Sequence, residues 1–447
     1  MKYPHYESYK DSGLNWLETI PANWDIKRIK YISKIFGRIG FRGYNADDLV
    51  GPGEGAITLG AGHIDKNDKI DLSSPVYLSW EKYEESPEIK VRKGDIIFGQ
   101  RGSIGKVAYV DKDYGKVTIN PSLILLKDIK LNPIYLTFFL QSPLIRKWVQ
   151  LIGNSTAVPM ISQEQFENFP CLIPTKEEQQ SIANFLDKET TRLDALIAKK
   201  QQLIETLKEK RIAVISHAVT KGLNPDVPMK DSGIEWIGKI PENWNASPIK
   251  FIVSTPITDG PHTTPDFIDE GIPFISAEAI EYGGINFNKK RGFISEEDHK
   301  LFSLKYKPKL NDIYVVKSGS TTGKIAFVDT EIEFNIWSPL AAVRVKKEFS
   351  PKFVFYALSA DSFQKQISLF WSFGTQPNIG MGVLQNLKIA YPDLNTQLEI
   401  VSSIDRRIEK IDITVQKTEM FVSKLQEYKT ALISAAVTGK IKVPEQA

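Results

Sequence analysis

The sequence is poor in the residues that form covalent or metal-bound frameworks. Of its 447 residues one is cysteine, Cys171, and five are histidines that show neither His-x-x-x-His nor Cys/His spacing. This composition excludes a disulfide framework and a cysteine zinc cluster, and we predict no structural metal site. The lone cysteine is expected to be a small buried apolar side chain in a reducing compartment.

Long apolar runs and an excess of charge are also missing. No stretch approaches 18 uninterrupted apolar residues, and the first residues, Met-Lys-Tyr-Pro-His-Tyr-Glu, contain no apolar core of a secretion signal. We therefore expect a cytoplasmic protein that is neither exported nor membrane-spanning. The formal net charge is +3, so any contact with nucleic acid has to come from local basic loops rather than from a bulk positive field.

Signatures of an active site are lacking as well. The segment Asn132-Pro-Ile-Tyr differs from the Asn-Pro-Pro-Tyr loop of amino-methyltransferases at the second proline, and helix capping explains it equally well. The segments Gly102 to Lys106 and Gly319 to Lys324 lack the first glycine of a phosphate loop and the hydroxyl residue after its lysine. No Gly-x-Ser-x-Gly elbow is present. We predict no catalytic residue and no cofactor in this chain.

What the chain does contain is a long internal repeat. The segment Lys-Asp-Ser-Gly-Leu-Asn-Trp at Lys10 returns as Lys-Asp-Ser-Gly-Ile-Glu-Trp at Lys230, and an offset of 217 to 220 residues persists through each half. Solenoid repeats are far shorter. At this length, each half can bury its own core. The sequence therefore predicts two duplicated domains and a two-fold architecture.

Each half has three parts in the same order. A docking segment at 1–24 returns at 223–244, and a region of short strands and turns at 25–173 returns at 245–391. A long charged helix at 174–222 returns at 392–447. The middle regions are expected to be compact α/β (α+β) domains, each with a helix that begins at Asn132-Pro133 or Ser350-Pro351.

Apolar residues recur in steps of three and four along both predicted long helices, which is a heptad pattern. The 44-residue stretch from Glu177 to Thr220 would be roughly 66 Å long as a straight helix, and such a helix has to bury its seam. Since the repeat is the one other segment with a matching seam, we expect an antiparallel coiled coil of the two copies. Its seam is predicted to contain Leu186, Leu193, Ile197, Ile204, Leu207, Ile404, Ile408, Ile411, Val415, Val422 and Leu425.

Four tryptophans in the docking segments, Trp16, Trp24, Trp236 and Trp244, are interpreted as packing residues. The second docking segment begins about ten residues after the first helix ends near Thr220. Two-fold symmetry would then place the first docking segment beside the end of the second helix, near Thr438. The two chain termini are therefore predicted to be neighbours.

Two loops at equivalent positions are suited to binding. Gln100-Arg-Gly-Ser and Lys317-Ser-Gly-Ser-Thr-Thr each join flexible backbone, hydroxyls and a cation, and such groups bind phosphate oxygens or base edges. An ordinary solvated hairpin turn is the alternative. The candidate DNA contacts, including those of two further loops, are Arg38, Arg42, Gln100, Arg101, Ser103, Lys106, His262, Thr263, Thr264, Lys317, Ser320, Thr321 and Lys324.

The repeated motifs resemble the specificity subunit of type I restriction-modification systems over almost the whole chain. The resemblance rests on the Lys-Asp-Ser-Gly to Ile-Pro-x-x-Trp segments, on Gly-Asp-Ile at 94 with Asn-Asp-Ile at 311, and on Gly-Ser-x-Gly-Lys at 102. It extends to Val-Pro-Met-Ile at 158–161, Gln-Pro-Asn-Ile at 376–379, and the helix starts after Pro174 and Pro392. The second helix start departs from the pattern, with Thr396 in the place of Glu178.

This resemblance implies that each middle region is a target recognition domain for one half of a split site in double-stranded DNA, with the paired helices setting the spacing. It also implies two modification subunits carrying S-adenosylmethionine, and restriction subunits that use ATP and Mg²⁺. Alternatives are the specificity chain of a system in which modification and cleavage are fused, a coiled-coil scaffold that touches no DNA, and a self-contained methyltransferase.

Overall fold

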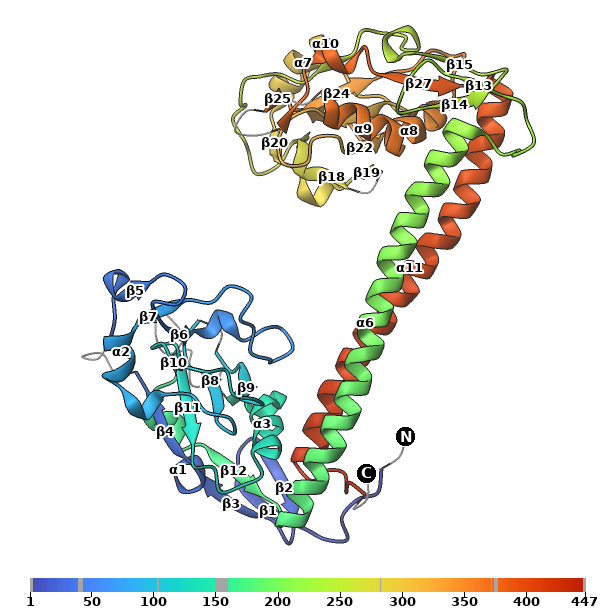
Figure 1. Ribbon diagram of the computed structural model, residues 1–447. Coiled ribbons are helices and arrows are strands. Elements are labelled where there is room, and N and C mark those ends of the chain that lie inside the picture. Colours follow the sequence, from blue (N-terminus) through green and yellow to red (C-terminus); the bar gives the residue numbers. More distant parts are fainter. Residues whose placement is uncertain are drawn as a thin grey trace. The chain divides into compact units, whose positions relative to one another are not determined.

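The computed structural model describes residues 3–38, 43–102, 104–145, 147–148, 160–281, 283–370, 372–373 and 377–444. The chain forms two compact units: unit 1 holds residues 1–200 and 420–447, and unit 2 holds residues 201–419. Each unit therefore contains one predicted recognition domain with parts of both long helices (Figure 1).

Unit 1 is built around two four-stranded sheets. The first has the order β4-β11-β8-β9 and the second has the order β10-β6-β7-β5. The strands of the first are β4 (Lys34–Gly37), β11 (Leu123–Lys127), β8 (Ile96–Gly99) and β9 (Val107–Tyr109). Those of the second are β10 (Val117–Ile119), β6 (Gly55–Leu59), β7 (Tyr77–Ser79) and β5 (Leu49–Val50).

The remaining elements of unit 1 are short. They are the hairpin β1 (Tyr9–Leu14) and β2 (Leu17–Pro21), and the pair β3 (Asp25–Arg28) and β12 (Pro170–Ile173). The helices are α1 (Ile29–Ile32), α2 (Trp80–Glu84), α3 (Pro133–Gln141) and α5 (Gln163–Glu167).

Unit 2 repeats this frame with insertions. Its main sheet has the order β16-β24-β21-β22, with strands β16 (Thr258–Asp259), β24 (Leu340–Val343), β21 (Ile313–Val316) and β22 (Ile325–Phe327). A three-stranded sheet joins β20 (Gly292–Ile294), β17 (Ile272–Ile275) and β23 (Asn335–Ile336).

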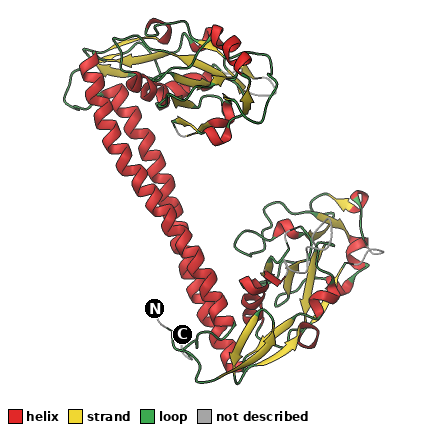
Figure 2. Ribbon diagram, turned by 180° about the vertical axis from the view of Figure 1, so that it is seen from behind, coloured by secondary structure: helices red, strands yellow, loops and turns green. Residues whose placement is uncertain are grey.

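The strand pairs are β13 (Met229–Asp231) with β14 (Lys239–Pro241), β15 (Asn245–Pro248) with β27 (Lys388–Tyr391), β18 (Ile280–Glu281) with β19 (Gly284–Ile285), and β25 (Ser372–Phe373) with β26 (Pro377–Asn378). The helices are α7 (Glu296–Lys305), α8 (Pro351–Ser359), α9 (Asp361–Leu369) and α10 (Met381–Leu384). Figure 2 shows this mixture of helix and strand in both units, as the predicted α/β (α+β) class requires.

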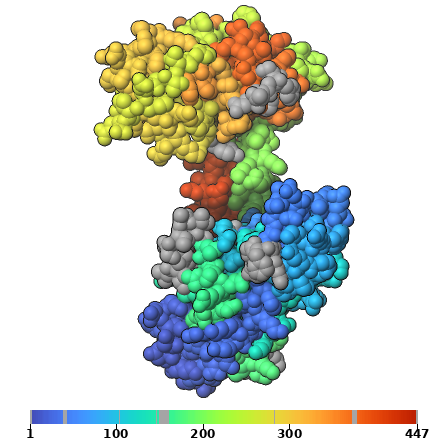
Figure 3. Space-filling model, turned by 90° about the vertical axis from the view of Figure 1, so that its left-hand side faces the viewer, coloured from blue at the N-terminus to red at the C-terminus, as the bar shows by residue number. Residues whose placement is uncertain are grey.

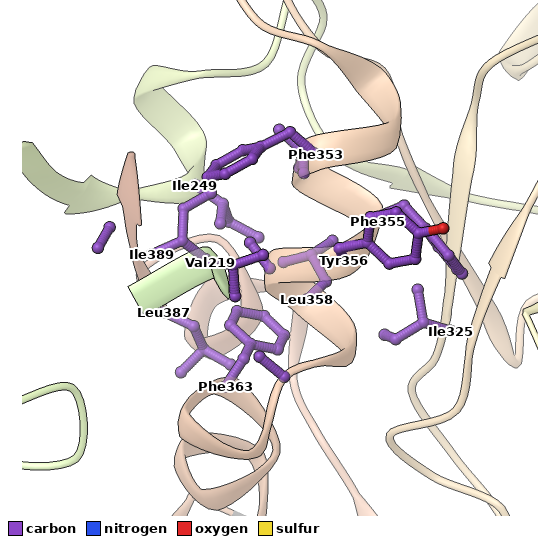
Figure 4. Packing of buried hydrophobic residues seen from close by; sticks show 14 of the residues in the cluster. Val219, Ile249, Ile325, Phe353, Phe355, Tyr356, Leu358, Phe363, Leu387 and Ile389 are labelled. Carbon is purple, nitrogen blue, oxygen red and sulfur yellow. The ribbon is translucent and has the colours of Figure 1, made fainter. Parts of the chain in front are cut away.

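Each main sheet is buried on both faces. In β8, Ile96 and Phe98 belong to one apolar cluster and Ile97 to another, because successive side chains of a strand point to opposite faces. In β21, Val315 and Tyr314 divide in the same way. Figure 4 shows one of these clusters in unit 2, where Phe353, Tyr356 and Leu358 of α8 pack beside Val219 and Ile389.

The two helix starts predicted from proline are confirmed. Asn132 Oδ1 accepts hydrogen bonds from the backbone N–H groups of Ile134 and Tyr135, and Ser350 Oγ accepts one from Phe353. Asn132 is thus engaged in capping α3. Cys171 is fully buried, and burial raises the pKa of its thiol, as expected of a structural residue.

The long helices are α6 (Lys176–Lys221) and α11 (Leu394–Val437), and they run side by side (Figures 1 and 2). Within unit 1, Lys429 Nζ lies 2.7 Å from Asp194 Oδ1, and within unit 2, Arg211 Nε lies 3.2 Å from Asp412 Oδ1. Because the α6 partner number rises as the α11 number falls, the pair is antiparallel. Every residue of the predicted seam is buried or half-buried, as predicted for a coiled coil.

The first long helix, α6, ends at Lys221, one residue from its predicted end. The predicted helix 392–447 is too long at its C-terminus, since α11 ends at Val437 and the described residues after it form a turn and an extended tail. That turn contains Gly439 in the left-handed region (φ +71°), where a β-carbon would approach Pro21 Cδ to 2.3 Å. In unit 2, Gly222 follows α6 at φ +79° and packs against Trp244 and Pro241.

Each long helix is joined to its domain by a buried glutamine at the equivalent position of the repeat. Gln179 Oε1 accepts a hydrogen bond from Asn132 N, and its Nε2 donates to Pro174 O, both at 2.9 Å. Gln397 makes the equivalent bonds with Ser350 N and Pro392 O, also at 2.9 Å. One side chain thus fixes the cap of α3 or α8 to the first turn of α6 or α11.

The docking segments pack as predicted. Trp24 and Trp244 are buried, Trp16 stacks on Phe169 with ring centroids 5.9 Å apart, and Trp236 meets Phe370 edge to face. The chain termini are neighbours in unit 1, as predicted. Lys442 N donates to Pro4 O at 2.7 Å, and the Tyr9 hydroxyl donates to Gly439 O at 3.1 Å.

A circular permutant tests this arrangement. Joining the termini by a short flexible linker and opening the chain between Gly222 and Leu223 should preserve the fold, because that junction is the repeat equivalent of the natural ends. Circular dichroism and thermal unfolding should match those of the parent chain. As a control, opening the chain within α6 at Lys200 should give an unfolded or aggregated product.

Candidate nucleic-acid interface

The loop that follows β8 in unit 1 is held against the segment at 160–161. Ile161 N donates to Gln100 O at 3.1 Å, and Arg101 forms an antiparallel bridge with Met160. Arg101 is exposed, with Nε 2.7 Å from Met160 Sδ, whereas Gln100 is buried and its amide donates to Pro121 O. Of these two predicted contacts, Arg101 alone is placed at the surface, and the Gln100 amide is engaged within the protein.

The equivalent loop after β21 in unit 2 has the same backbone bonds. Ile379 N donates to Lys317 O, and Lys317 N donates to Pro339 O, both at 2.8 Å. In unit 1, Gln100 N donates in the same way to Ser122 O at 2.9 Å. The described parts of the two motifs, residues 160–161 and 377–379, therefore support the two candidate loops, a role that their sequence did not indicate.

The other predicted contacts of these loops differ in exposure. Ser320 and Lys324 are exposed, and Thr321 is half-buried with its carbonyl accepting from Lys324 N. Lys106 is half-buried because its Nζ donates to Ile64 O at 2.5 Å. Ser103 lies outside the described residues.

Arg38 does not occupy the surface position that a DNA contact requires. It is 4% exposed, its Nε donates to Ile119 O at 3.1 Å, and its guanidinium also reaches Thr118 Oγ1. Burial lowers the pKa of the guanidinium. The interpretation of Arg38 as a DNA contact is therefore wrong: it joins β4 to β10 inside unit 1. Arg42 lies outside the described residues.

In unit 2, the loop of Lys317 and the loop of His262 are far apart in the sequence, but both contact Asp259, the last residue of β16. Lys317 Nζ lies 3.1 Å from Asp259 Oδ2 and is 12% exposed, and Lys305 Nζ of α7 lies 2.6 Å from Oδ1. The ring of His262 lies 3.2 Å from Oδ2 and is 71% exposed. Thr263 and Thr264 are exposed beside it. Lys317 is thus an internal partner of Asp259, while His262 and its neighbours form the surface.

The charge balance at this point is set by the lysines. Burial disfavours a charged carboxylate, but hydrogen bonds from Lys305 and Lys317 outweigh burial and hold the pKa of Asp259 below its usual range. Sequence reasoning missed Lys305, because an exposed helix with several lysines gives no sign of which one turns inward. Asp259 itself opens the segment Asp-Gly-Pro-His-Thr-Thr, which contains the predicted contacts His262, Thr263 and Thr264.

Two searches for other kinds of site found nothing. Within the described ranges, no three His, Cys, Asp or Glu side chains are grouped so that they could hold a metal ion. No helix in that part of the chain is both long enough and apolar enough to cross a membrane.

Comparison with known proteins agrees with this architecture. The family model of the type I restriction modification DNA specificity domain matches residues 60–206 and again 254–420. The chain therefore belongs to the type I restriction-modification DNA specificity family. Within that family it corresponds to the specificity subunit, and its role is DNA sequence specificity.

The relatives span nearly the same length. The putative type I restriction enzyme MjaX specificity subunit of Methanocaldococcus jannaschii is 25% identical over 97% of this chain and 98% of its own length. The MjaVIII specificity subunit of the same organism is 26% identical over 80% of this chain and 81% of its own.

Solved structures share the fold. A chain from a study of complex assembly and conformational transition in the type I system is similar with a TM-score of 0.69 at 16% identity, covering 94% of this chain and 99% of that one. The HsdS subunit from Thermoanaerobacter tengcongensis gives a TM-score of 0.50 at 16% identity, covering 94% and 98%.

The two loop cations should differ in their effect on stability. Lys317→Ala removes one partner of a buried carboxylate, and should lower the free energy of unfolding by less than the about 3–5 kcal/mol typical of a broken buried pair, because Lys305 remains. Arg101→Ala should change it by less than about 0.5 kcal/mol. Urea unfolding at neutral pH measures both. Because the pKa of Asp259 is lowered in the folded state, the difference caused by Lys317 should shrink as the pH falls through the range in which aspartate is protonated.

Proposed function

We propose that the chain reads a two-part DNA site, with one half-site bound by each unit, and that it holds two modification subunits. The observation that supports this most is the repeated loop: both copies are held by the same backbone hydrogen bonds, yet at the equivalent position one carries Arg101 and the other Ser318. A shared frame with different side chains suits two readers of two different sequences.

The chain is proposed to be non-catalytic by itself. S-adenosylmethionine would be bound by the modification subunits, and ATP with Mg²⁺ by restriction subunits of the full complex, since the chain offers no motif for either. Its place of action would be the cytoplasm, where such a complex meets DNA.

Mapping of methylated bases tests the proposal directly. The chain is expressed with its modification subunits in a host that lacks other DNA methylation, and the host genome is sequenced for methylated bases. We expect one motif of two short defined halves separated by a spacer of fixed length. Arg101→Ala should relax or weaken one half only, at a cost of about 1–3 kcal/mol if it contacts a base. Lys112→Ala, at an exposed cation on the turn after β9, is the matched control and should leave the motif unchanged.

The alternatives give other results. A coiled-coil scaffold without DNA contacts would direct no motif, and its retention on heparin would depend little on salt. A self-contained methyltransferase would bind S-adenosylmethionine without partners. A specificity chain of a fused system would direct a motif only with that fused partner.

The spacer length is proposed to be set by α6 and α11. Inserting one heptad after Lys200 and another after Met420 keeps both seams in phase, since Lys200 Nζ lies over the ring of Phe421 at 5.6 Å and the two insertions face each other. Each helix should lengthen by about 10 Å, so the spacer should grow by about three base pairs while both half-sites stay the same.

Insertion of two residues at the same two places is the control, because it turns each seam by about 200°, to the opposite face of its helix, and should abolish assembly. If the heptad variant folds, binds its modification subunits and still methylates the original spacing, the helices do not set the distance.

A further inference from the structure

The cluster around Asp259 lies at one end of unit 2. Figure 1 shows α7 and β25 at the end of this unit opposite to the one where α6 and α11 enter it. In Figure 3 the yellow residues, which include β17, β20 and α7, form one broad face of the same unit. Lys305 and His262 are both partly exposed, so the cluster presents an ammonium group and an imidazole ring at the surface around a buried carboxylate.

The pairing register identifies the equivalent positions in unit 1. Asp259 pairs with Ala341 in the sheet of unit 2, and Ala341 is the repeat equivalent of Ile124, whose partner on β4 is Gly37. Asp259 therefore stands where unit 1 has Gly37. By the same comparison, with identical backbone hydrogen bonds, Lys317 stands where unit 1 has Gln100.

Asp259 and Lys317 of unit 2 are thus both replaced by uncharged residues in unit 1. Unit 1 has neither charge at these two positions and fills the space beside Gly37 with the Gln163 amide, whose Nε2 lies 2.1 Å from where a β-carbon would stand. Unit 2 has both charges, with Lys305 added from α7. Since the same frame is complete without them, the charges are not a requirement of the fold.

A carboxylate beside a DNA-binding surface has an electrostatic cost, because it repels phosphates and weakens binding to every sequence alike. It also restricts two flexible lysine side chains to one geometry, so that less rotamer freedom remains to be lost on binding. Such a group reduces non-specific affinity and orders the cations that contact DNA, and both effects raise discrimination between sequences.

We propose that Asp259 is the positioning residue of the second half-site: it holds Lys305, Lys317 and the loop of His262 in one arrangement, and thereby sets the base preference of unit 2. This inference rests on the proposed function. Asp259 acts through its partners and does not itself touch the bases.

The test uses the complete complex and the same methylation mapping. Asp259→Asn should relax one or more positions in one half of the motif and leave the other half and the spacer unchanged. Binding to a random-sequence duplex should become tighter, and the slope of log affinity against log salt should steepen by about one, since removal of the carboxylate leaves one more positive charge to pair with a phosphate. A residue with a purely structural role would lower the unfolding temperature without changing either the motif or the slope.

A second variant keeps the test valid if Asp259→Asn alone fails to fold. Asp259→Asn with Lys317→Gln leaves no buried unpaired charge, because Lys305 is half exposed and still donates to Gly260 O at 3.0 Å. The variant approaches the neutral pair of unit 1, so it should fold and show the same relaxed half. Glu333→Gln, which removes an exposed carboxylate paired with Lys307 in the same unit, is the matched control and should behave as the parent. An unchanged motif in the double variant would overturn the proposal. Absence of any two-part motif with the parent chain would instead overturn the proposed function.

Discussion

The burial of α6 and α11 is the constraint on which both units depend. Each recognition domain completes its core with the beginning of its own long helix and the end of the other: Leu186 and Val437 belong to the core of unit 1, and Val219 and Ile404 to that of unit 2. Fully burying such a side chain contributes about 1.5–3 kcal/mol. Neither domain has a closed core without helix segments from both halves of the sequence.

The internal repeat separates the parts of the frame that are fixed from those that vary. The Gln179 and Gln397 bonds, the helix caps and the backbone bonds of the candidate loops recur in both units. So does a buried acid paired with a cation from the neighbouring strand, Asp95 with Lys127 and Asp312 with Arg344. The exchanges between Gly37 and Asp259 and between Gln100 and Lys317 lie at strand ends and in loops, where a change of side chain leaves the sheets intact.

Much of the architecture could be predicted from the sequence, because it depends on local or periodic signals. Neighbouring residues determine the heptad seam, the helix caps at Asn132 and Ser350, and the strands around Ile97 and Ala326. The candidate site was harder. Arg38, Gln100 and Lys317 have the composition of surface loop residues, but their partners are Ile119 O, Pro121 O and Asp259. Two of these partners are distant in the chain. Composition does not indicate which polar side chain will form a hydrogen bond or ion pair inside the protein.

The closure of the termini has a consequence for synthesis. Unit 2 is one continuous stretch, residues 201–419, whereas unit 1 needs residues 420–447 in addition to its first 200. A ribosome makes most of unit 1 first, but the segment around Gly439, which covers Pro21, Trp24 and Tyr9, is made only after unit 2. Synthesis of unit 1 therefore begins first but is completed after that of unit 2. Until then the apolar face of α6 in unit 1 lacks its partner, the end of α11. During synthesis, unit 2 can therefore complete its core while unit 1 still waits for the final turns of α11.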